Sequence, residues 1–342
     1  MNDLGRVLIY GSGAIGSYVG ALLSEAGADV TLLARGAHAN AIARAGGLMF
    51  QQPGGRDRHV PVKVCRPGET VGRYDTVFVG LKATQLAQCA QDMMRVLAAE
   101  GSLVMLQNGL PWWYFDGLDS PLRGTALRCL DPQGELARSI DLRRVVGGVI
   151  YRSAELAAPG VLLAAVIDWQ RLQIGELDGT RSDRCSRIAS GLEEAGLPVE
   201  VTADIRTAKW EKLIGNLVWN PLSALTQSAY GHIPASPMAA ELAAALVQEG
   251  TAVAKSVGVT VKLDAKAQLA RKVGNFTEHP SMLQDVRAGR PLELDAIVNS
   301  VIEIAALTGV AVPTLKTIAA CLTLLDERIR MDGVAIGPSP RG

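Results

Sequence analysis

The chain has 342 residues, 48% of them hydrophobic, and its 34 basic side chains balance 34 acidic ones. This length predicts about two domains. The even charge, with a pI near 6.9, argues against a polyanion-binding surface and therefore against nucleic acid as a partner. No apolar run approaches the roughly 18 residues that a membrane span needs, so we expect no membrane association.

The cysteines and histidines argue against a metal centre. Five cysteines and four histidines are scattered without metal-ligand spacing, so we expect no structural zinc and no other metal. Dispersed cysteines, odd in number, are typical of reduced thiols. The N-terminus runs straight into the strand-like RVLIYG, without a basic region and an apolar signal core. We therefore expect a cytoplasmic protein.

Apolar runs alternate with helical patterns over the first 200 residues, which is typical of parallel βαβ units. From about Ala203 onward only helical patterns follow. We expect strands at Arg6–Tyr10, Val30–Ala34, Thr76–Leu81, Ser102–Leu106, Val145–Tyr151, Val161–Ile167 and Arg171–Ile174, a helix at Ile15–Ala26, and later helices at 204–219, 237–257, 262–274, 293–308 and 313–329. The fold class is thus an α/β N-terminal domain over residues 1–202, an all-α C-terminal domain over 203–330 and a loose tail over 331–342.

A glycine-rich segment joins the first strand to the first helix. It has the pattern G-x-G-x-x-G, formed by Gly11, Ser12, Gly13, Ala14, Ile15 and Gly16. The first glycine permits a tight turn, the second lets a pyrophosphate approach the backbone, and the third lets helix and strand pack closely. The helix N-terminus offers unpaired N–H groups to the phosphates. We expect a Rossmann-type dinucleotide site; the alternative is that the glycines serve only a turn.

The end of the second strand indicates which dinucleotide binds. Arg35 stands there, 19 residues after Gly16. NAD sites usually have an acidic residue at this point, which bonds the ribose 2′-hydroxyl, whereas a guanidinium suits a 2′-phosphate. Asp29 precedes the strand and is badly placed to replace the acid. The sequence therefore predicts NADPH/NADP+ as the cofactor, with a solvent-facing arginine as the alternative.

Two further polar loops follow predicted strands. Lys82 and Gln85 lie in TVFVGLKATQ, and Asn108 is followed by Gly109 in LVMLQNG. Ligands bind at the carboxyl ends of strands in such sheets, so we expect these side chains to line a cleft near the nicotinamide. The alternatives are a surface lysine and an Asx turn.

Lys212, Asn216 and Asn220 recur at intervals of four in WEKLIGNLVWNP and share one face of an otherwise apolar helix. Burying them unpaired would cost roughly 1–3 kcal/mol for each amide and more for the ammonium, so we expect a ligand there. Lys212 would protonate a carbonyl oxygen as hydride arrives at carbon, while the amides bind substrate. Alternatively, Lys212 reaches solvent and the amides cap backbone. Asn220 also precedes Pro221, where a helix tends to end.

A second polar constellation lies in PSMLQDVRAGRPLELDAIVNS, residues 280–300. Glu293 and Asp295 open a predicted helix, where an acid also favours the helix dipole. The functional interpretation pairs a carboxylate with Lys212 or the ribose, and Ser281 with the substrate. The alternative is that Glu293 serves only the dipole.

The chain resembles the ketopantoate reductases (2-dehydropantoate 2-reductases) over nearly its whole length. The motifs are GSGAIG, Arg35, GLKATQ, QNG, DIRTAKWEKLIGNLVWNPLSALT and SMLQDVRAGRPLELDAIVNS. The resemblance implies NADPH-dependent reduction of 2-dehydropantoate to (R)-pantoate, a step toward pantothenate and coenzyme A. It also implies a Rossmann domain followed by a helical domain like that of 6-phosphogluconate dehydrogenase. PWWYFDG after Asn108 marks a divergent branch.

The resemblance also implies roles for individual residues. Lys212 falls on the family's proton donor and Glu293 on its acidic residue beside the active site and the cofactor. The remaining matches are Asn216, Asn220 and Ser281 for the substrate, and Lys82, Asn108 and the backbone of Ala154 for the cofactor. A further substrate asparagine of some members is replaced near Tyr230.

Two other functions stay open on this sequence. One is a related dehydrogenase of another 2-oxo acid, a β-hydroxyacid or an imine, since such enzymes also have a lysine four residues before an asparagine. The other is a non-catalytic NADP-binding sensor, against which the Lys212 stripe weighs, because a sensor needs no proton donor. The apolar surface of the helical domain would support a homodimer.

Overall fold

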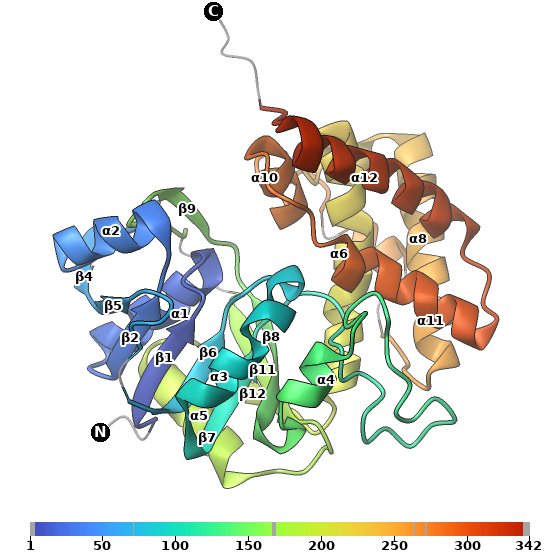
Figure 1. Cartoon of the computed structure of the whole chain (residues 1–342). Helices are drawn as coiled ribbons and strands as arrows, with labels where there is room; N and C mark the ends of the chain where they lie inside the picture. Colours follow the sequence, from blue (N-terminus) through green and yellow to red (C-terminus); the bar gives the residue numbers. More distant parts are fainter. Residues whose placement is uncertain (1–3, 71, 166–168, 263–264, 271, 338–342) are drawn as a thin grey trace, which may run out of the picture. The chain divides into compact units, whose positions relative to one another are not determined.

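The computed structural model describes residues 4–70, 72–165, 169–262, 265–270 and 272–337 (Figure 1). The chain forms two compact units. Unit 1 comprises Met1–Gln107, Phe115–Gly124 and Gln133–Ile205, and unit 2 comprises Asn108–Tyr114, Thr125–Pro132 and Arg206–Gly342.

The larger sheet of unit 1 has eight strands within the described residues, in the order β12-β11-β8-β7-β6-β1-β2-β5. Neighbouring strands are parallel except for the antiparallel pair β8–β11. The central strands are buried on both faces, as continuous apolar runs in a parallel sheet require. The strands are β1 (Arg6–Tyr10), β2 (Asp29–Leu33), β5 (Lys63–Cys65), β6 (Tyr74–Val79), β7 (Leu97–Met105), β8 (Val145–Tyr151), β11 (Arg171–Glu176) and β12 (Val199–Val201).

A second, smaller sheet covers the other side of the first helix. Its order is β4-β3-β10-β9, with β3 at Gly47–Gln51, β4 at Arg58–Pro61, β9 at Glu155–Ala158 and β10 at Val161–Leu163. Helix α1 (Ala14–Glu25) packs against both sheets. Gly20 faces the large sheet so closely that a Cβ there would lie 2.5 Å from Leu32. On the other side, the ring of Tyr18 meets that of Phe50 edge-on at 5.9 Å.

The remaining helices of unit 1 are short and border these sheets. They are α2 (Gly36–Ala45), η1 (Ala83–Gln85), η2 (Ala87–Cys89), α3 (Ala90–Val96), α4 (Glu135–Ser139), η3 (Leu142–Arg144) and α5 (Asp183–Glu194). All seven predicted strands of unit 1 are present within a few residues of their expected bounds. The predicted strand Val161–Ile167 ends at Leu163, and residues 166–168 lie outside the described residues. The small sheet was not predicted as a sheet, because most of its strands have only three to five residues and exposed faces.

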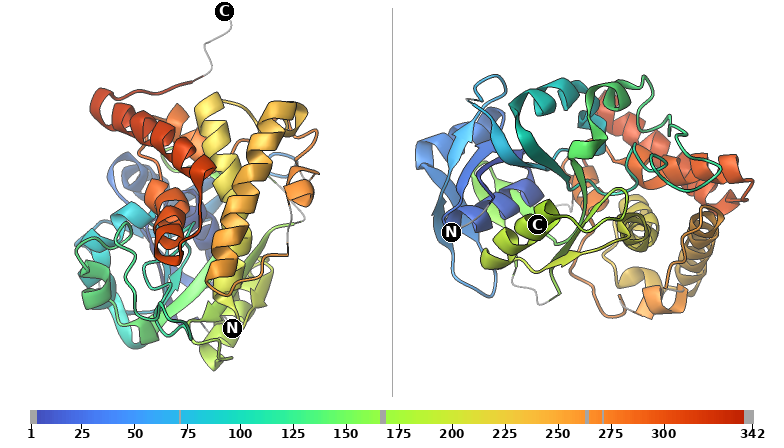
Figure 2. Two further views of the ribbon diagram at one scale, coloured as in Figure 1. Left: turned by 90° about the vertical axis from the view of Figure 1, so that its right-hand side faces the viewer. Right: turned by 90° about the horizontal axis from the view of Figure 1, so that it is seen from below.

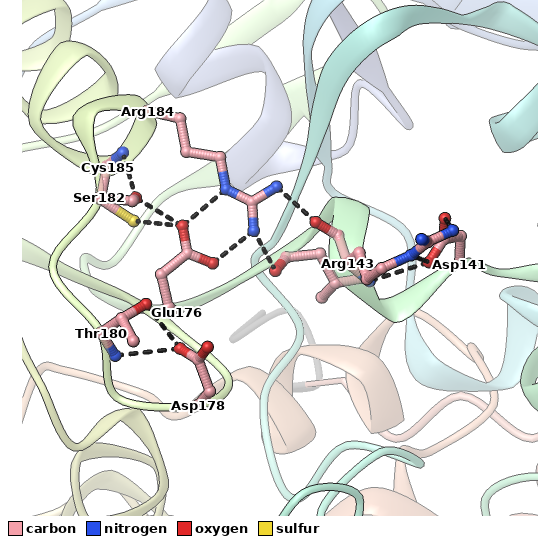
Figure 3. Close-up of polar contacts among 9 residues, drawn as sticks. Asp141, Arg143, Glu176, Asp178, Thr180, Ser182, Arg184 and Cys185 are labelled. Atoms are coloured by element: carbon pink, nitrogen blue, oxygen red, sulfur yellow. Dashed lines mark hydrogen bonds and ion pairs between the residues drawn. The ribbon is translucent and has the colours of Figure 1, made fainter.

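A buried ion pair fastens the end of β11 to the start of α5 (Figure 3). The carboxylate of Glu176 accepts hydrogen bonds from Arg184 Nε at 2.6 Å, from Arg184 Nη2 and from Ser182 Oγ at 2.5 Å. Arg184 Nη1 also donates to the carbonyl oxygen of Arg143 at 2.6 Å, which ties the start of β8 into the same network. Burial alone would raise the pKa of Glu176, but the bonds from Arg184 and Ser182 outweigh it and lower the pKa.

Unit 2 has helices joined by loops, and no strand among its described residues. Its helices are α6 (Ile205–Thr226), α7 (His232–Ala235), α8 (Pro237–Ser256), α9 (Ala265–Ala270), α10 (Ser281–Arg287), the π-helical turn η4 (Asp295–Asn299), α11 (Ser300–Thr308) and α12 (Pro313–Asp332). Figure 2 shows the long helices of this unit in two further views. Helices α6 and α8 touch closely, since a Cβ at Gly250 would lie 2.8 Å from Ile214 and Leu217. The fold class, α/β followed by all-α, is confirmed.

Helix α6 does not end before Pro221, so the local explanation proposed for Asn220 is wrong. The helix continues to Thr226 with Pro221 inside it. Proline cannot donate an N–H to the carbonyl of Leu217 and usually kinks or ends a helix. Here Leu217, Val218 and Leu222 are buried on both sides of the proline, and this packing outweighs the missing hydrogen bond.

The PWWYF segment packs inside unit 2 as far as Tyr114. Trp112, Trp113 and Tyr114 are all buried. The first two turns of α6 hold this segment: Trp210 Nε1 donates to the Tyr114 hydroxyl at 2.7 Å, and Arg206 Nε donates to the Tyr114 carbonyl at 2.8 Å. A stretch from the first half of the sequence is thereby built into the helical unit.

Candidate active site

The glycine loop of unit 1 needs glycine at two positions. Gly11 has φ +97°, in the left-handed region that side chains rarely adopt. A Cβ at Gly16 would lie 2.2 Å from the carbonyl oxygen of Gly11, a distance that no real contact shows. Ser12 N–H donates to the carbonyl oxygen of Leu33 at 3.1 Å, which holds the loop against the end of β2. The loop is therefore tightly folded at the carboxyl ends of β1 and β2.

The residues around this loop fit a dinucleotide pyrophosphate. Helix α1 begins at Ala14 after Gly13, and the described residues place neither an acid in its first turn nor a side-chain cap on its N-cap. Its N–H groups and positive dipole end thus remain available for phosphate oxygens. Ser12 Oγ is buried and has no hydrogen-bond partner in the described part of the chain.

Arg35 is exposed just beyond the carboxyl end of β2, at the same end of the sheet as the glycine loop. It follows β2 and forms the N-cap of α2 in an extended conformation. Asp29 begins β2, at the opposite end of the strand, where it binds Lys63 Nζ at 2.6 Å. The strand therefore presents a guanidinium and not a carboxylate where an adenosine ribose binds in such sheets, and this suits a 2′-phosphate.

The loops after β6, β7 and β8 carry the other predicted cofactor residues. Lys82 follows β6, and its N–H donates to Gln85 Oε1 at 3.1 Å, so Gln85 caps its own turn. Ala154 is half-buried between β8 and β9. Gln107, which sequence reasoning passed over, donates from Nε2 to the carbonyl oxygens of Val79 at 2.8 Å and Leu81 at 3.2 Å. The glutamine of the QNG motif thus fixes the end of β6.

In unit 2, the predicted proton donor meets Asn108. Lys212 Nζ donates to Asn108 Oδ1 at 2.6 Å. The loop that carries Asn108 is clamped against η4: Leu110 N–H donates to the carbonyl oxygen of Ala296 at 2.9 Å. Gly109 has φ +77°, and a Cβ there would lie 2.1 Å from the same oxygen. Only glycine fits, so the backbone holds Asn108 in register with Lys212.

Burial tunes the amine of Lys212. It lowers the pKa of Lys212 to about 8, and the negative charge of Glu293 opposes this change. Glu293 is 9% exposed and stands two residues before the π-helical turn η4, a kind of turn that is frequent at functional sites. An amine with this pKa is mostly protonated near neutrality, and its lowered pKa makes it a readier proton donor than an ordinary lysine.

A second buried lysine lies one turn earlier on α6, and the sequence reasoning missed it. Lys209 is 4% exposed. Burial, and to a smaller degree the charge of Lys212, lowers the pKa of Lys209 to about 7. The available signal was its spacing of three from Lys212, which places both lysines on neighbouring parts of one helix face.

The polar stripe of α6 continues beyond Lys212. Asn220 is 2% exposed, and its Nδ2 has no hydrogen-bond partner among the residues that the structure describes. Ser223 Oγ, three residues further, is likewise buried and unpartnered in the described chain. Asn216 is half-buried, and Ser281 is exposed as the first residue of α10. Buried donors without partners are costly, and they are the groups that a polar ligand would satisfy.

Neither a metal site nor a membrane-spanning helix is found among the described residues. These residues include no cluster of three or more His, Cys, Asp or Glu side chains suited to a metal ion. Within the same ranges, none of the helices has the length and apolar character that crossing a bilayer requires.

These features define a class: a dinucleotide-binding unit and a helical unit with a half-buried lysine are typical of nicotinamide-dependent dehydrogenases. The family described as "Ketopantoate reductase PanE/ApbA" matches residues 7–179, and "Ketopantoate reductase PanE/ApbA C terminal" matches residues 204–326. The 2-dehydropantoate 2-reductase of Mesorhizobium japonicum is 38% identical over 94% of this chain and 97% of its own. The chain therefore belongs to the ketopantoate reductase family, whose members are oxidoreductases acting on CH–OH groups with NADPH.

Solved structures agree with this assignment. A crystal structure from Ralstonia solanacearum, assigned to the ketopantoate reductases, has a TM-score of 0.88 and 33% identity, covering 97% of this chain and all of its own. A D-mandelate dehydrogenase bound to NADH and anilino(oxo)acetate has a TM-score of 0.80 and covers 95% of this chain and all of its own. Its identity is only 18%, so it shares the fold and nothing more can be concluded from it.

Proposed function

We propose that the protein reduces 2-dehydropantoate (ketopantoate) to (R)-pantoate with NADPH, on the route to pantothenate and coenzyme A. One observation carries the proposal: Lys212, with a pKa lowered to about 8, donates to Asn108 at 2.6 Å. On the same helix, Asn220 keeps a buried amide donor that has no partner in the described chain. The family and the 38% identical relative support ketopantoate as the proposed substrate.

Bound NADPH supplies the hydride that reaches the substrate's carbonyl carbon. The chain's own residues then have three tasks. Lys212 donates a proton to the carbonyl oxygen, and its ammonium stabilises the alkoxide as charge develops. Asn108 orients the amine through its hydrogen bond, and the carboxylate of Glu293 favours the charged form of Lys212. We assign Asn216, Asn220 and Ser281 to the carboxylate and hydroxyl of the substrate.

The preference for NADPH over NADH is assigned to Arg35. The guanidinium is exposed at the end of β2, and the described strand end has no carboxylate that would favour a 2′-hydroxyl. A single guanidinium can donate two parallel hydrogen bonds to the oxygens of one phosphate. The glycine loop, Lys82, Gln85 and Ala154 complete the proposed cofactor residues of unit 1. Asn108 and Glu293, which belong to unit 2, keep their assignment to the cofactor as predictions.

A second candidate function is the reduction of another 2-oxo acid, or oxidation of a β-hydroxyacid or reduction of an imine. A non-catalytic NADP sensor is disfavoured, because a buried amine and a buried unpartnered amide would add cost without use in a protein that only senses the cofactor.

Steady-state turnover tests the proposal. Ketopantoate and a panel of 2-oxo acids, β-hydroxyacids and imines are compared at the NADPH absorbance band. We expect ketopantoate to give the highest kcat/KM and Lys212→Ala to abolish turnover while NADPH still binds. Lys316→Ala, an exposed lysine on α12, is the matched control. Turnover of another panel member with higher kcat/KM would select the second function, and no turnover with any would select the sensor.

We also propose a cytoplasmic location and a homodimer. The location is supported by five free cysteines, which suit a reducing compartment. The dimer is supported by exposed apolar side chains of unit 2, namely Met238, Leu324 and Met331. Cell fractionation and light scattering after size-exclusion chromatography test the two statements.

A further inference from the structure

Unit 1 contains a cavity that none of the proposed cofactor residues line. Its volume is about 190 Å³, and it is bounded by Tyr18 and Leu22 of α1, Phe50 of β3 and Gly196 after α5. A single water needs only roughly 10–15 Å³ of such space, so the cavity can hold a small molecule. The glycine loop, Arg35 and the Lys82 turn are all outside its walls.

Arg152 lines this cavity, and no acidic side chain among the described residues pairs with its charge. It follows β8, and its guanidinium carbon lies 4.4 Å above the centre of the Tyr18 ring. Its Nε and Nη1 are buried and have no hydrogen-bond partner in the described residues. Burial lowers the pKa of Arg152, and the only group that opposes this among the described interactions is Tyr18. Arg152 as a whole is half-buried, but two buried donors without a partner are a costly arrangement that an anion would relieve.

The second arginine of the cavity shows the contrast. Arg58 lies over the Phe50 ring at 4.1 Å, much as Arg152 lies over Tyr18. Its donors are nonetheless used: Nε and Nη2 donate to the Glu25 carboxylate at 2.5 and 3.0 Å, and Nη1 donates to Gln52 Oε1 at 2.6 Å. Arg58 is therefore neutralised by Glu25, whereas Arg152 has no such carboxylate partner among the described residues.

Within the described chain, the other polar side chains of the wall bond to groups other than Arg152. Gln170 Oε1 accepts from the Tyr18 hydroxyl at 2.6 Å, and Gln170 Nε2 donates to the carbonyl oxygen of Gly196 at 3.4 Å. The guanidinium carbon of Arg152 lies over the Tyr18 ring, and the donors of the planar guanidinium lie in its own plane. A carboxylate or phosphate accepts two such in-plane bonds from one arginine.

We propose that this cavity binds a small oxyanion, a carboxylate or a phosphate group, through Arg152, at a site separate from the dinucleotide pyrophosphate. A neutral ligand would leave the charge uncompensated, and a cation would be repelled by it. The site does not depend on the identity of the substrate proposed above. Carboxylate and phosphate share the recognition chemistry, and binding measurements with each anion distinguish them.

Equilibrium dialysis of the full chain tests the site, with NADP+ at saturation so that the glycine loop and Arg35 are occupied. Labelled inorganic phosphate and labelled acetate are titrated separately at constant ionic strength set with chloride. We expect saturable binding of at least one of them, with one equivalent per chain lost or weakened at least tenfold in Arg152→Met. The anion that is lost identifies the source.

Arg171→Met is the matched control. Its guanidinium also lies over a tyrosine, Tyr151, at 4.2 Å, but Arg171 is exposed and outside the cavity. Leu22→Trp, which fills the cavity without changing charge, should abolish the same binding and keeps the test decisive if Arg152→Met fails to fold. Binding that both Arg152→Met and Leu22→Trp leave unchanged, or no saturable binding of either anion by the natural protein, overturns the proposal.

Discussion

Lys212 Nζ donates a hydrogen bond to Asn108 Oδ1 over 2.6 Å, joining residues 104 positions apart in the chain. Both belong to unit 2, although Asn108 directly follows Gln107, which belongs to unit 1 and donates to the end of β6. The asparagine expected to contact the cofactor is therefore held by the helical unit, beside the amine. Its first role can be to orient that amine.

Replacing Asn108 by alanine should lower kcat about 10- to 100-fold. A hydrogen bond to a charged group contributes roughly 1.5–3 kcal/mol, and the amine would lose the partner that orients it. The Kd for NADPH, measured by fluorescence titration, should change less than kcat. If the Kd rises and kcat is retained, Asn108 acts on the cofactor alone.

The kcat/KM of the natural enzyme should fall as the pH rises through about 8, the pKa of Lys212 in the free protein. The proton donor is the ammonium form, so activity is present below this pKa and lost above it. Glu293→Gln removes the charge that raises the pKa of Lys212 and should move the alkaline limb to lower pH. A profile of kcat/KM between pH 6 and 10 locates the alkaline limb of each of the two enzymes, and a limb that Glu293→Gln leaves unmoved would separate Glu293 from Lys212.

Arg35→Ala should weaken NADPH and leave NADH little changed. The loss of a charge-assisted contact to the 2′-phosphate predicts a KM for NADPH that is about 10- to 100-fold higher. The control is Arg44→Ala. Arg44 is exposed in the last turn of α2, the helix that Arg35 caps, and its replacement should leave both KM values unchanged. A cofactor preference that survives Arg35→Ala would contradict the 2′-phosphate assignment.

Asn220→Leu should stabilise the free protein and impair substrate binding. The substitution removes a buried amide whose Nδ2 has no partner in the described residues, which favours folding by roughly 1 kcal/mol. The substrate would lose that donor, so its KM should rise. Urea unfolding and steady-state kinetics measure the two effects. Lower stability with an unchanged KM would assign the amide to structure.

Glu176→Gln should lower the free energy of unfolding by about 3 kcal/mol, because it leaves Arg184 without its buried partner. The folded pKa of Glu176 lies below the ordinary carboxyl value. Its contribution is therefore fully present above the ordinary pKa near 4.3 and is lost as the pH falls through the folded pKa. The variant should show a weaker acid dependence in thermal unfolding.

Glu69→Gln is the matched control for this acid. Its carboxylate pairs with Arg66 at 3.5 Å, but both side chains are about half exposed. Exposed pairs contribute roughly 0–1 kcal/mol, so the variant should unfold close to the natural protein. Equal losses in the two variants would mean that the Glu176 pair is no stronger than a surface pair.

The sequence by itself determined those features that depend on local patterns of residues. The alternation of strands and helices, the turn geometry required at Gly11 and Gly16, and the arginine after β2 are encoded within a few neighbouring residues. The same holds for the stripe of Lys212, Asn216 and Asn220, because a helical repeat places them on one face whatever else surrounds them. The family resemblance then supplied roles for these residues, and those roles stay predictions.

Only the tertiary structure decided the features that depend on distant contacts. The small sheet joins short strands from residues 47–61 and 155–163, and packing carries α6 through Pro221. Distant contacts also produce the bond between Asn108 and Lys212 and the lowered pKa values of Lys209 and Lys212. The same is true of Arg152, whose buried Nε and Nη1 have no partner in the described residues. The physical reason is that burial and pairing are sums over neighbours, and the neighbours of these side chains come from parts of the chain that no local pattern connects.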